Sequence, residues 1–424
     1  MRSPIVCFAF VLLAGLALTA SFLAAQTPYV YVNDNNPASG FNTATGFAVN
    51  TGPVLTLVPG SPFATTSTGF AAMPAPRQEV AISYGAVNCL YVADPFGTST
   101  FPTGDVAAFT INAGAGALTL VGNYFDPSNT SGANKWLPVA VDRRVGFPYV
   151  FAAFTGERKI AFFKANTNTC QLSWASSTPA AGPTGFPAVG MAVSKAGPHV
   201  LVVTYGDGSV QSFKIGGGTL TPLAIFSSTG NINQGARPQS VDITKNGKYA
   251  VFGDAQTGPT EVEVAKILPG GTLAPTVDYG GTAVASGVNL GPGLDSENVW
   301  LSPAAVSGNF YLYITNNASG QVTTARISQV TGVVSPAGVC TSGFTNPTTL
   351  APLTWTQAGG LHTIKTTSTG VGVAVAEKGS PSSVALLQVQ TASGCTREVT
   401  GSPFTDPFST MGLASVDVFP SRIY

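Results

Sequence analysis

A repeat of about 50 to 60 residues constrains the fold of this chain more than any other feature. An apolar segment that ends at a polar turn recurs seven times, at intervals of 60, 60, 51, 49, 62 and 61 residues. The seven turn positions are Asp34, Asp94, Phe154, Tyr205, Asp254, Asn316 and Glu377. Self-similarity at such a period is typical of solenoids and propellers, in which each repeat is one supersecondary unit.

The repeats have the pattern of β-strands. In residues 187–226, four apolar segments are separated by A-G-P, G-D-G and G-G-G, and in residues 238–279 Asn246-Gly247 is a hairpin turn signal. Residues 261–264 alternate polar and apolar side chains, which fits a strand. No capped amphipathic helix is predicted after the first 25 residues. The sequence therefore predicts an all-β chain.

The main strands, such as residues 200–203, are apolar on both faces. Both faces of a sheet are buried when it lies between two neighbouring sheets, as in a β-propeller. A chain with 44% apolar and only 9% charged residues agrees with this arrangement. A parallel β-helix is the alternative, but its coils are usually about 20 to 30 residues long.

The two ends of the repeat region complete one blade. The first repeat begins at Tyr29 without a preceding inner strand, and residues 413–419 have the pattern of that missing strand. We predict a seven-bladed propeller of four-stranded antiparallel blades, closed by pairing of the C-terminal strand with the first blade. Closure removes exposed sheet edges. Residues 26–424 are expected to form this single domain.

The first 25 residues predict a signal peptide. Arg2 precedes an apolar stretch from Ile5 to Ala20, and Leu23-Ala24-Ala25 offers small residues for cleavage before Gln26. An uncleaved membrane anchor is the alternative, because the stretch could nearly span a bilayer. We expect cleavage, a secreted or periplasmic location, and no membrane association afterwards.

Four cysteines follow this segment: Cys89, Cys170, Cys340 and Cys395. An even number in an exported chain permits two disulfides with three possible connectivities, and four unpaired thiols remain an alternative. Cys170 and Cys395 occupy the same predicted turn, between the third and fourth strands. Our hypothesis is that neighbouring blades are linked, Cys89 to Cys170 and Cys340 to Cys395. With no C-x-x-C and only two histidines, we expect no metal and no cofactor.

Several short motifs resemble YVTN-type β-propeller repeats. They are residues 29–35 (YVYVNDN), 312–317 (LYITNN), 331–334 (TGVV), 60–63 and 401–404 (both GSPF), and 116–120 (GALTL). The resemblance covers nearly the whole chain after the first 25 residues. It implies the lactonase-like seven-bladed group, which includes 6-phosphogluconolactonases and muconate-cyclising enzymes. These motifs are strand and turn residues, so they indicate the fold more specifically than the activity.

Charged side chains at one face of the predicted propeller form a candidate ligand site. The turns after the second strands and the links between blades meet at this face. The candidates are Asp34, Asp94, Asp254 and Glu377 from the turns and Arg77 and Arg237 from the links, with His362 on the innermost strand of the seventh blade. They could bind a polar ligand or a cation, or the turn residues could hydrogen-bond their own backbone. Arg143-Arg144 is interpreted as part of a solvated turn.

The sequence favours a binding or scaffold module for a protein, a glycan or a small ligand, because no catalytic set is assembled and no G-x-S-x-G elbow is present. A lactonase-like hydrolase or cyclase, with its site at the channel mouth, is the alternative that the resemblance implies. Carboxylates, His or Arg converging there would favour the enzyme. Nineteen basic and nineteen acidic residues argue against nucleic acid as a partner. We expect a monomer.

Overall fold

The computed structural model describes residues 27–419 with internal gaps. The residues outside this description are 1–26, 36–40, 68–78, 97–103, 130–133, 135–136, 145, 227–237, 255–260, 277–287, 290–295, 303–304, 318, 351–357, 366–370, 378–381, 410–412, 414 and 420–424. The predicted signal peptide therefore lies outside the described residues. Among the residues described, we find no helix with the length and hydropathy needed to span a bilayer.

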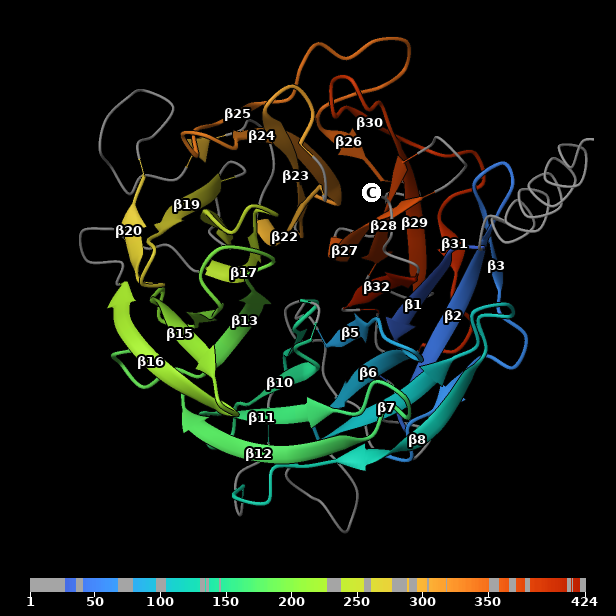
Figure 1. The fold of residues 1–424 in the computed structure, drawn as a ribbon. Coiled ribbons are helices and arrows are strands. Elements are labelled where there is room, and N and C mark those ends of the chain that lie inside the picture. Colours follow the sequence, from blue (N-terminus) through green and yellow to red (C-terminus); the bar gives the residue numbers. More distant parts are fainter. Residues whose placement is uncertain are drawn as a thin grey trace, which may run out of the picture.

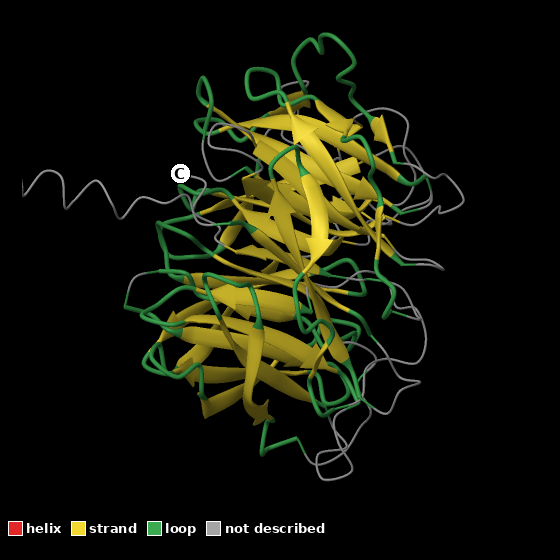
Figure 2. Cartoon of the chain, turned by 90° about the vertical axis from the view of Figure 1, so that its right-hand side faces the viewer, coloured by secondary structure: helices red, strands yellow, loops and turns green. Residues whose placement is uncertain are grey.

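Seven antiparallel sheets are arranged radially around a central axis (Figure 1). The side view shows only strands and loops in the described part of the chain (Figure 2). We number the sheets as blades 1 to 7 in chain order. This confirms the predicted all-β, seven-bladed propeller, and each of the seven repeated turns follows the second strand of its blade.

The strands of the first four blades follow the predicted repeat. Blade 1 contains β1 (Tyr29–Asn33), β2 (Thr43–Asn50), β3 (Val54–Leu57), β4 (Phe63–Ala64) and the C-terminal β32 (Val416–Phe419). Blade 2 contains β5 (Val80–Ser83), β6 (Asn88–Asp94), β7 (Asp105–Ile111) and β8 (Leu118–Tyr124). Blade 3 contains β9 (Val139–Val141), β10 (Tyr149–Phe154), β11 (Lys159–Ala165) and β12 (Leu172–Pro179). Blade 4 contains β13 (Ala188–Val193), β14 (Val200–Tyr205), β15 (Val210–Gly216) and β16 (Thr219–Phe226).

The last three blades each carry a short fifth strand that pairs with the third, as β4 pairs with β2 in blade 1. Blade 5 contains β17 (Pro238–Ile243), β18 (Tyr249–Asp254), β19 (Glu261–Ile267), β20 (Leu273–Pro275) and β21 (Val288–Asn289). Blade 6 contains β22 (Ser296–Leu301), β23 (Asn309–Asn316), β24 (Gln321–Ser328), β25 (Val334–Pro336) and β26 (Thr348–Thr349). Blade 7 contains β27 (Ala358–Lys365), β28 (Val371–Glu377), β29 (Ser383–Val389), β30 (Thr396–Glu398) and β31 (Phe404–Thr405).

The ring is closed by the C-terminal strand. β32 pairs antiparallel with β1, in a register that joins Tyr29 to Phe419 and Val32 to Val416. It thereby supplies the inner strand that the first repeat lacks, as predicted. Figure 1 shows β32 beside β1 at the centre of the ring. Because the first and last segments share one sheet, no blade edge is left open at the junction.

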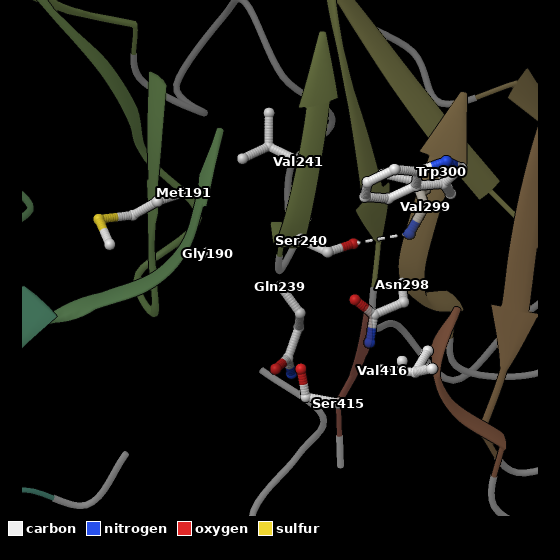
Figure 3. Close-up of a pocket in the computed structure, with 11 residues that line it drawn as sticks. Gly190, Met191, Gln239, Ser240, Val241, Asn298, Val299, Trp300, Ser415 and Val416 are labelled. Atoms are coloured by element: carbon white, nitrogen blue, oxygen red, sulfur yellow. Dashed lines mark hydrogen bonds between the residues drawn. The ribbon is translucent and has the colours of Figure 1, made fainter. Parts of the chain in front are cut away.

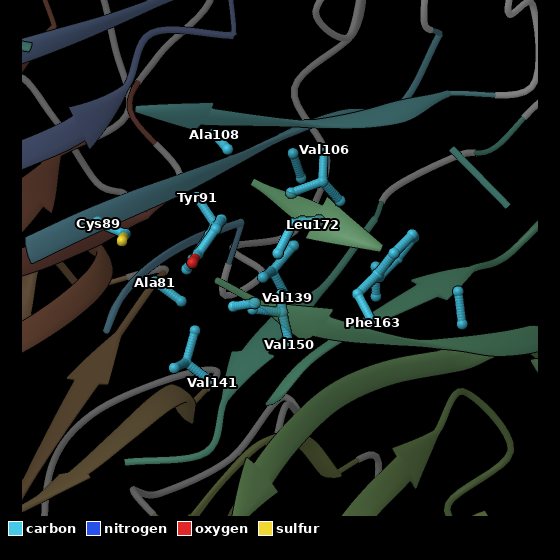
Figure 4. Packing of buried hydrophobic residues seen from close by; sticks show 14 of the residues in the cluster. Ala81, Cys89, Tyr91, Val106, Ala108, Val139, Val141, Val150, Phe163 and Leu172 are labelled. Carbon is cyan, nitrogen blue, oxygen red and sulfur yellow. The ribbon is translucent and has the colours of Figure 1, made fainter. Parts of the chain in front are cut away.

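The core lies between blades, since both faces of each sheet are covered. Figure 4 shows one such layer, in which Tyr91 of β6 and Val106 of β7 face Val139 of β9 and Val150 of β10. These four side chains are fully buried. Packing on both faces explains why the main strands are apolar at successive positions instead of alternating.

A tyrosine and a glycine hold neighbouring blades together. The Tyr29 ring lies against Gly116 of the next blade, where a Cβ would come within 2.3 Å of the ring. The same contact recurs between Tyr311 and Gly394. The Tyr29 hydroxyl also donates to the Gly114 carbonyl over 2.8 Å. The Tyr and Gly of the repeat motifs are therefore residues that fit one blade against the next.

Two disulfides also join neighbouring blades. Cys89 is bonded to Cys170 and Cys340 is bonded to Cys395. The first links blade 2 to blade 3, and the second links the segment after β25 of blade 6 to blade 7. The pairing is the one that the sequence suggested.

Candidate functional site

The seven inner strands surround the central channel and run in the same direction. They are β32, β5, β9, β13, β17, β22 and β27, and each pairs antiparallel with the second strand of its blade. We call the end at which they begin the first end of the channel, and the end at which they finish the second end. The turns after the second strands lie at the first end, because β27 pairs Ala358 with Glu377 and β17 pairs Pro238 with Asp254.

Asp417 of β32 contacts groups from three other blades, two side chains and one backbone amide. Its carboxylate lies 2.5 Å from Arg143 Nη2, which follows β9, and 2.9 Å from His362 Nε2 of β27. It also accepts a hydrogen bond of 2.8 Å from the Ile82 amide of β5. Arg143 Nε donates to the Ile82 carbonyl over 3.0 Å, which fixes the guanidinium across the channel. His362 is 3% exposed and Asp417 is 1% exposed, so this is a desolvated cluster.

The electrostatics of the cluster favour its charged form. Burial alone would raise the pKa of Asp417, but Arg143 and then His362 lower it, and the net pKa lies below the ordinary value. Burial likewise opposes the charge on Arg143, yet Asp417 raises the pKa of the guanidinium above its usual range. The Asp417 carboxylate and the Arg143 cation thus stabilise each other.

A second acid, Asp242 of β17, has a similar role at the equivalent position of its blade: it pairs with Val251, as Asp417 pairs with Tyr31. Lys195 Nζ, which follows β13, contacts both carboxylate oxygens at 2.9 and 3.2 Å. The Leu301 amide of β22 donates to Asp242 over 2.9 Å. Asp242 also contributes to the raised pKa of Arg143, after Asp417 and Tyr84. Two carboxylates and two cations are therefore balanced within the channel.

Trp300 of β22 contacts one partner of each acid, His362 beside Asp417 and Lys195 beside Asp242. Its ring centre lies 3.8 Å from that of His362, and Lys195 Nζ lies 5.1 Å from the ring centre, within reach of a cation–π interaction. Trp300 and Met191 line two channel pockets. The charged pocket, at the second end, contains Arg143, Lys195 and Asp242, whereas the amide pocket, at the first end, contains Gln239, Ser240, Asn298 and Ser415 (Figure 3).

One local sequence pattern positions both acids. Ser240-Val241-Asp242 in β17 and Ser415-Val416-Asp417 at β32 are the same tripeptide on inner strands. In each, the serine hydroxyl accepts a backbone amide of the next blade, from Val299 in one case and from Glu79 and Val80 in the other. The aspartate accepts another amide two or three residues further along. Residues two positions apart on a strand point to the same face, so Ser and Asp of each tripeptide both reach backbone amides of the next blade. These hydrogen bonds hold the carboxylates in place.

Three of the four acids predicted at the turns, Asp34, Asp94 and Glu377, do not line either pocket. Asp34 accepts hydrogen bonds from Thr43 and Thr45 and lies beside Asp406, and burial raises its pKa well above the ordinary value. Asp94 accepts from Asn42 over 2.7 Å, and burial also raises its pKa. Glu377 accepts from Ser383, and burial raises its pKa to about 7. All three are almost fully buried between strands and blades.

The remaining predicted positions have varied outcomes. Arg77 and Arg237 lie outside the described residues, as does the side chain of Asp254. His362 is on the innermost strand of blade 7 and belongs to the Asp417 cluster. The interpretation of Arg143-Arg144 as part of a solvated turn is wrong: Arg143 pairs with Asp417, and Arg144 donates to the Ser194 and Pro198 carbonyls.

Sequence reasoning missed five residues of the channel: Arg143, Lys195, Asp242, Trp300 and Asp417. The repeated Ser-Val-Asp tripeptide on two inner strands was an available signal. In the described part of the chain, no group of three His, Cys, Asp or Glu side chains has the arrangement of a metal site. The chemistry that these residues offer is hydrogen bonding, proton transfer at His362 and stabilisation of negative charge by Arg143 and Lys195.

No protein-family model and no curated protein matches the sequence. Among solved structures, a protein from Lactobacillus plantarum is similar with a TM-score of 0.62 and 14% identity, covering 93% of this chain and 99% of that one. A candidate 6-phosphogluconolactonase from Bacteroides fragilis has a TM-score of 0.59 and 13% identity with the same coverage. Another, from Bacteroides uniformis, has a TM-score of 0.58 and 12% identity. At these identities the likeness shows a shared seven-bladed propeller fold.

Proposed function

We propose that this protein is a lactonase-like hydrolase that opens cyclic esters in its central channel. The observation that carries the proposal is the convergence of Arg143 and His362 on the Asp417 carboxylate, at 2.5 and 2.9 Å. Ester hydrolysis uses a histidine, a carboxylate and a cation that lie close together. The structural similarity to candidate 6-phosphogluconolactonases supports the fold of such an enzyme.

The roles follow from the positions of these groups. His362, oriented by Asp417, takes a proton from water as the water oxygen bonds to the lactone carbonyl carbon. Arg143 uses Nε and Nη2 in its described hydrogen bonds, so Nη1 is left to stabilise the oxyanion in the charged pocket. The ring C–O bond then breaks, and the proton held by His362 passes to the leaving alkoxide. One lactone and one water give one hydroxy acid.

We also propose that the enzyme acts outside the cytoplasm as a single-domain monomer. The two disulfides support this location, because such bonds form and persist in oxidising compartments. The sequence pattern of the first 25 residues agrees with export.

The test is proton release from a panel of lactones, which includes D-glucono-1,5-lactone, δ-valerolactone and γ-butyrolactone. At least one lactone should be hydrolysed faster than its spontaneous rate at pH 7. Arg143→Gln should lower kcat by about 100-fold, the effect typical of losing one oxyanion donor.

Arg144→Gln is the matched control, because Arg144 is adjacent in sequence but donates only to groups of blade 4. It should retain kcat. If no lactone is hydrolysed and one binds, the binding-module interpretation replaces this proposal. Equal losses in the two variants would also refute the role of Arg143.

A further inference from the structure

The surface of this protein is more basic than its formal net charge of zero. Eleven of the nineteen acidic residues are buried, whereas none of the described lysines and arginines is buried. Among the other acids in the described part of the chain, only Glu157, Asp207 and Glu398 reach the surface. The described surface therefore carries an excess of positive charge.

Four of the cations occupy the same repeat position on consecutive blades. They lie on the third strands β11, β15, β19 and β24, which follow one another around the ring in Figure 1. The four are Lys164, Lys214, Lys266 and Arg326, paired across the sheet with Tyr149, Val200, Tyr249 and Tyr311 of the second strands. Because the third strands run in the same direction as the inner strands, this position is near the second end of the channel. Blades 1, 2 and 7 have Ala48, Thr110 and Gln388 there, so the cations follow one side of the ring.

The turn between β17 and β18 adds two more cations at the same end. Lys245 and Lys248 flank Asn246-Gly247 in this turn, and both side chains are exposed. Neither these lysines nor the four cations of the third strands belong to an ion pair that the structure describes. We call the set Lys164, Lys214, Lys245, Lys248, Lys266 and Arg326 the basic face.

An exposed apolar side chain lies next to the lysines of the blade 5 turn. Val330, in the turn between β24 and β25, is 73% exposed. Its carbonyl accepts a hydrogen bond of 2.6 Å from the Tyr249 hydroxyl, and Asn246 Nδ2 donates to the preceding carbonyl over 3.2 Å. These bonds hold the turn of blade 6 against the turn of blade 5. Phe147, 39% exposed in the turn between β9 and β10, is a second apolar residue at this end.

We propose that the basic face binds the surface of an anionic lipid bilayer. Its six cations would lie at the lipid phosphates, and Val330 and Phe147 would lie between the headgroups. Charge complementarity favours a polyanion as the partner, and the exposed apolar residues favour lipid, because a soluble acidic polymer offers them no apolar phase. The proposal departs from the sequence expectation of no membrane association, which did not consider the distribution of charge. It goes beyond the proposed hydrolysis and does not depend on it, because the basic face shares no residue with the Asp417 cluster.

The experiment is cosedimentation of the full mature protein with phosphatidylcholine vesicles that contain about one third phosphatidylglycerol. Each cation near an anionic surface strengthens binding about fivefold, so six cations predict an association constant on the order of 10⁴ M⁻¹ at low salt. Binding should weaken at least tenfold in about 0.5 M salt, since salt screens exposed charges. Absence of binding to the anionic vesicles would overturn the proposal. Equal binding to pure phosphatidylcholine vesicles would refute the role of the cations.

Paired variants test whether the basic face is the surface that binds. Lys245→Gln/Lys248→Gln should weaken vesicle binding about 25-fold. The matched control is Arg158→Gln/Lys159→Gln, which removes the same charge from the turn after β10 at the first end. It should bind as the wild type does. Equal losses in the two variants would show that only net charge matters and would refute the proposal.

A second pair tests the apolar contact. Val330→Ser should weaken vesicle binding about threefold to tenfold, because the apolar side chain no longer leaves water on binding. Phe186→Ser is the control, since Phe186 is 51% exposed and precedes β13 at the first end. It should leave vesicle binding unchanged. If Val330→Ser binds vesicles as the wild type does, and soluble polyglutamate binds more tightly than vesicles, the basic face is a site for an acidic polymer and the proposal fails.

Sedimentation equilibrium without lipid tests the remaining occupant, a second copy of the chain. The wild type should be monomeric at the concentrations of the vesicle experiment. A dimer that Val330→Ser dissociates would assign the basic face to contacts between copies and would overturn the proposal.

Discussion

Among stability experiments, replacement of Asp417 by asparagine is the most sensitive test of the Asp417 cluster. The change removes one charge and leaves the size of the side chain and an oxygen for the Ile82 amide. Removing one partner of a buried ion pair lowers stability by about 3–5 kcal/mol. The Arg143 side chain is 21% exposed and regains some hydration, so we place the loss at the lower limit, about 3 kcal/mol.

Asp242→Asn is the matched comparison. Its Lys195 partner is 27% exposed and no histidine contacts it, so we expect a loss of about 1–2 kcal/mol.

The pH dependence follows from the lowered pKa of Asp417. A carboxyl whose pKa is lower in the folded state stabilises the protein above its unfolded pKa, about 3.9, and this stabilisation is lost as the pH falls through the folded value. The difference between wild type and Asp417→Asn should therefore be constant from pH 7 to about pH 5 and shrink below about pH 4. Urea unfolding at each pH gives the free energies. A loss under about 1 kcal/mol at pH 7, or a difference that grows on acidification, would refute the reasoning.

Three further outcomes are expected. The double variant Cys89→Ala/Cys170→Ala, which opens a bond between residues 81 positions apart, should lose about 4 kcal/mol in urea unfolding; unchanged stability would contradict the link between blades. Glu377 has a folded pKa of about 7 against an ordinary 4.5, so its contribution is fully present below pH 4.5 and is lost as the pH rises to 7. Glu377→Gln should therefore be about 2–3 kcal/mol more stable than wild type at pH 8 and equal to it at pH 4; a wild-type advantage at pH 8 would contradict the burial argument. Gly116→Ala should lower the unfolding free energy by at least about 2 kcal/mol, because φ is +70° and the new Cβ would overlap the Tyr29 ring; full stability would show that the contact is loose.

The fold was predictable because its signals are local and repeated. The turn spacing gave seven blades, and the unpaired first strand at Tyr29 required a partner such as residues 416–419. The equivalent turns of Cys170 and Cys395 indicated disulfides between neighbouring blades. Each inference needed only the period of the repeat and the pairing rules of antiparallel sheets.

The site was not predictable in the same way, because it depends on contacts across the ring. Arg143 and Asp417 are 274 positions apart in sequence, and their contact arises from the angle between blades 1 and 3. Attention to the turns at the first end led to Asp34 and Glu377, which the structure buries among local hydrogen-bond partners. Only His362 was recognised, from its place on an inner strand.

The central claim is that His362, held by Asp417, transfers the proton in lactone hydrolysis. The most direct measurement compares kcat/KM for the best lactone of the panel between wild type, His362→Gln and His199→Gln. His199, the other histidine, also pairs with an aspartate, Asp142, but it lies before β14, whereas His362 lies on the inner strand β27 beside Asp417 and Trp300. We predict a loss of about 10²–10⁴-fold for His362→Gln and less than about 3-fold for His199→Gln. Retention of wild-type kcat/KM by a folded His362→Gln variant would contradict the account.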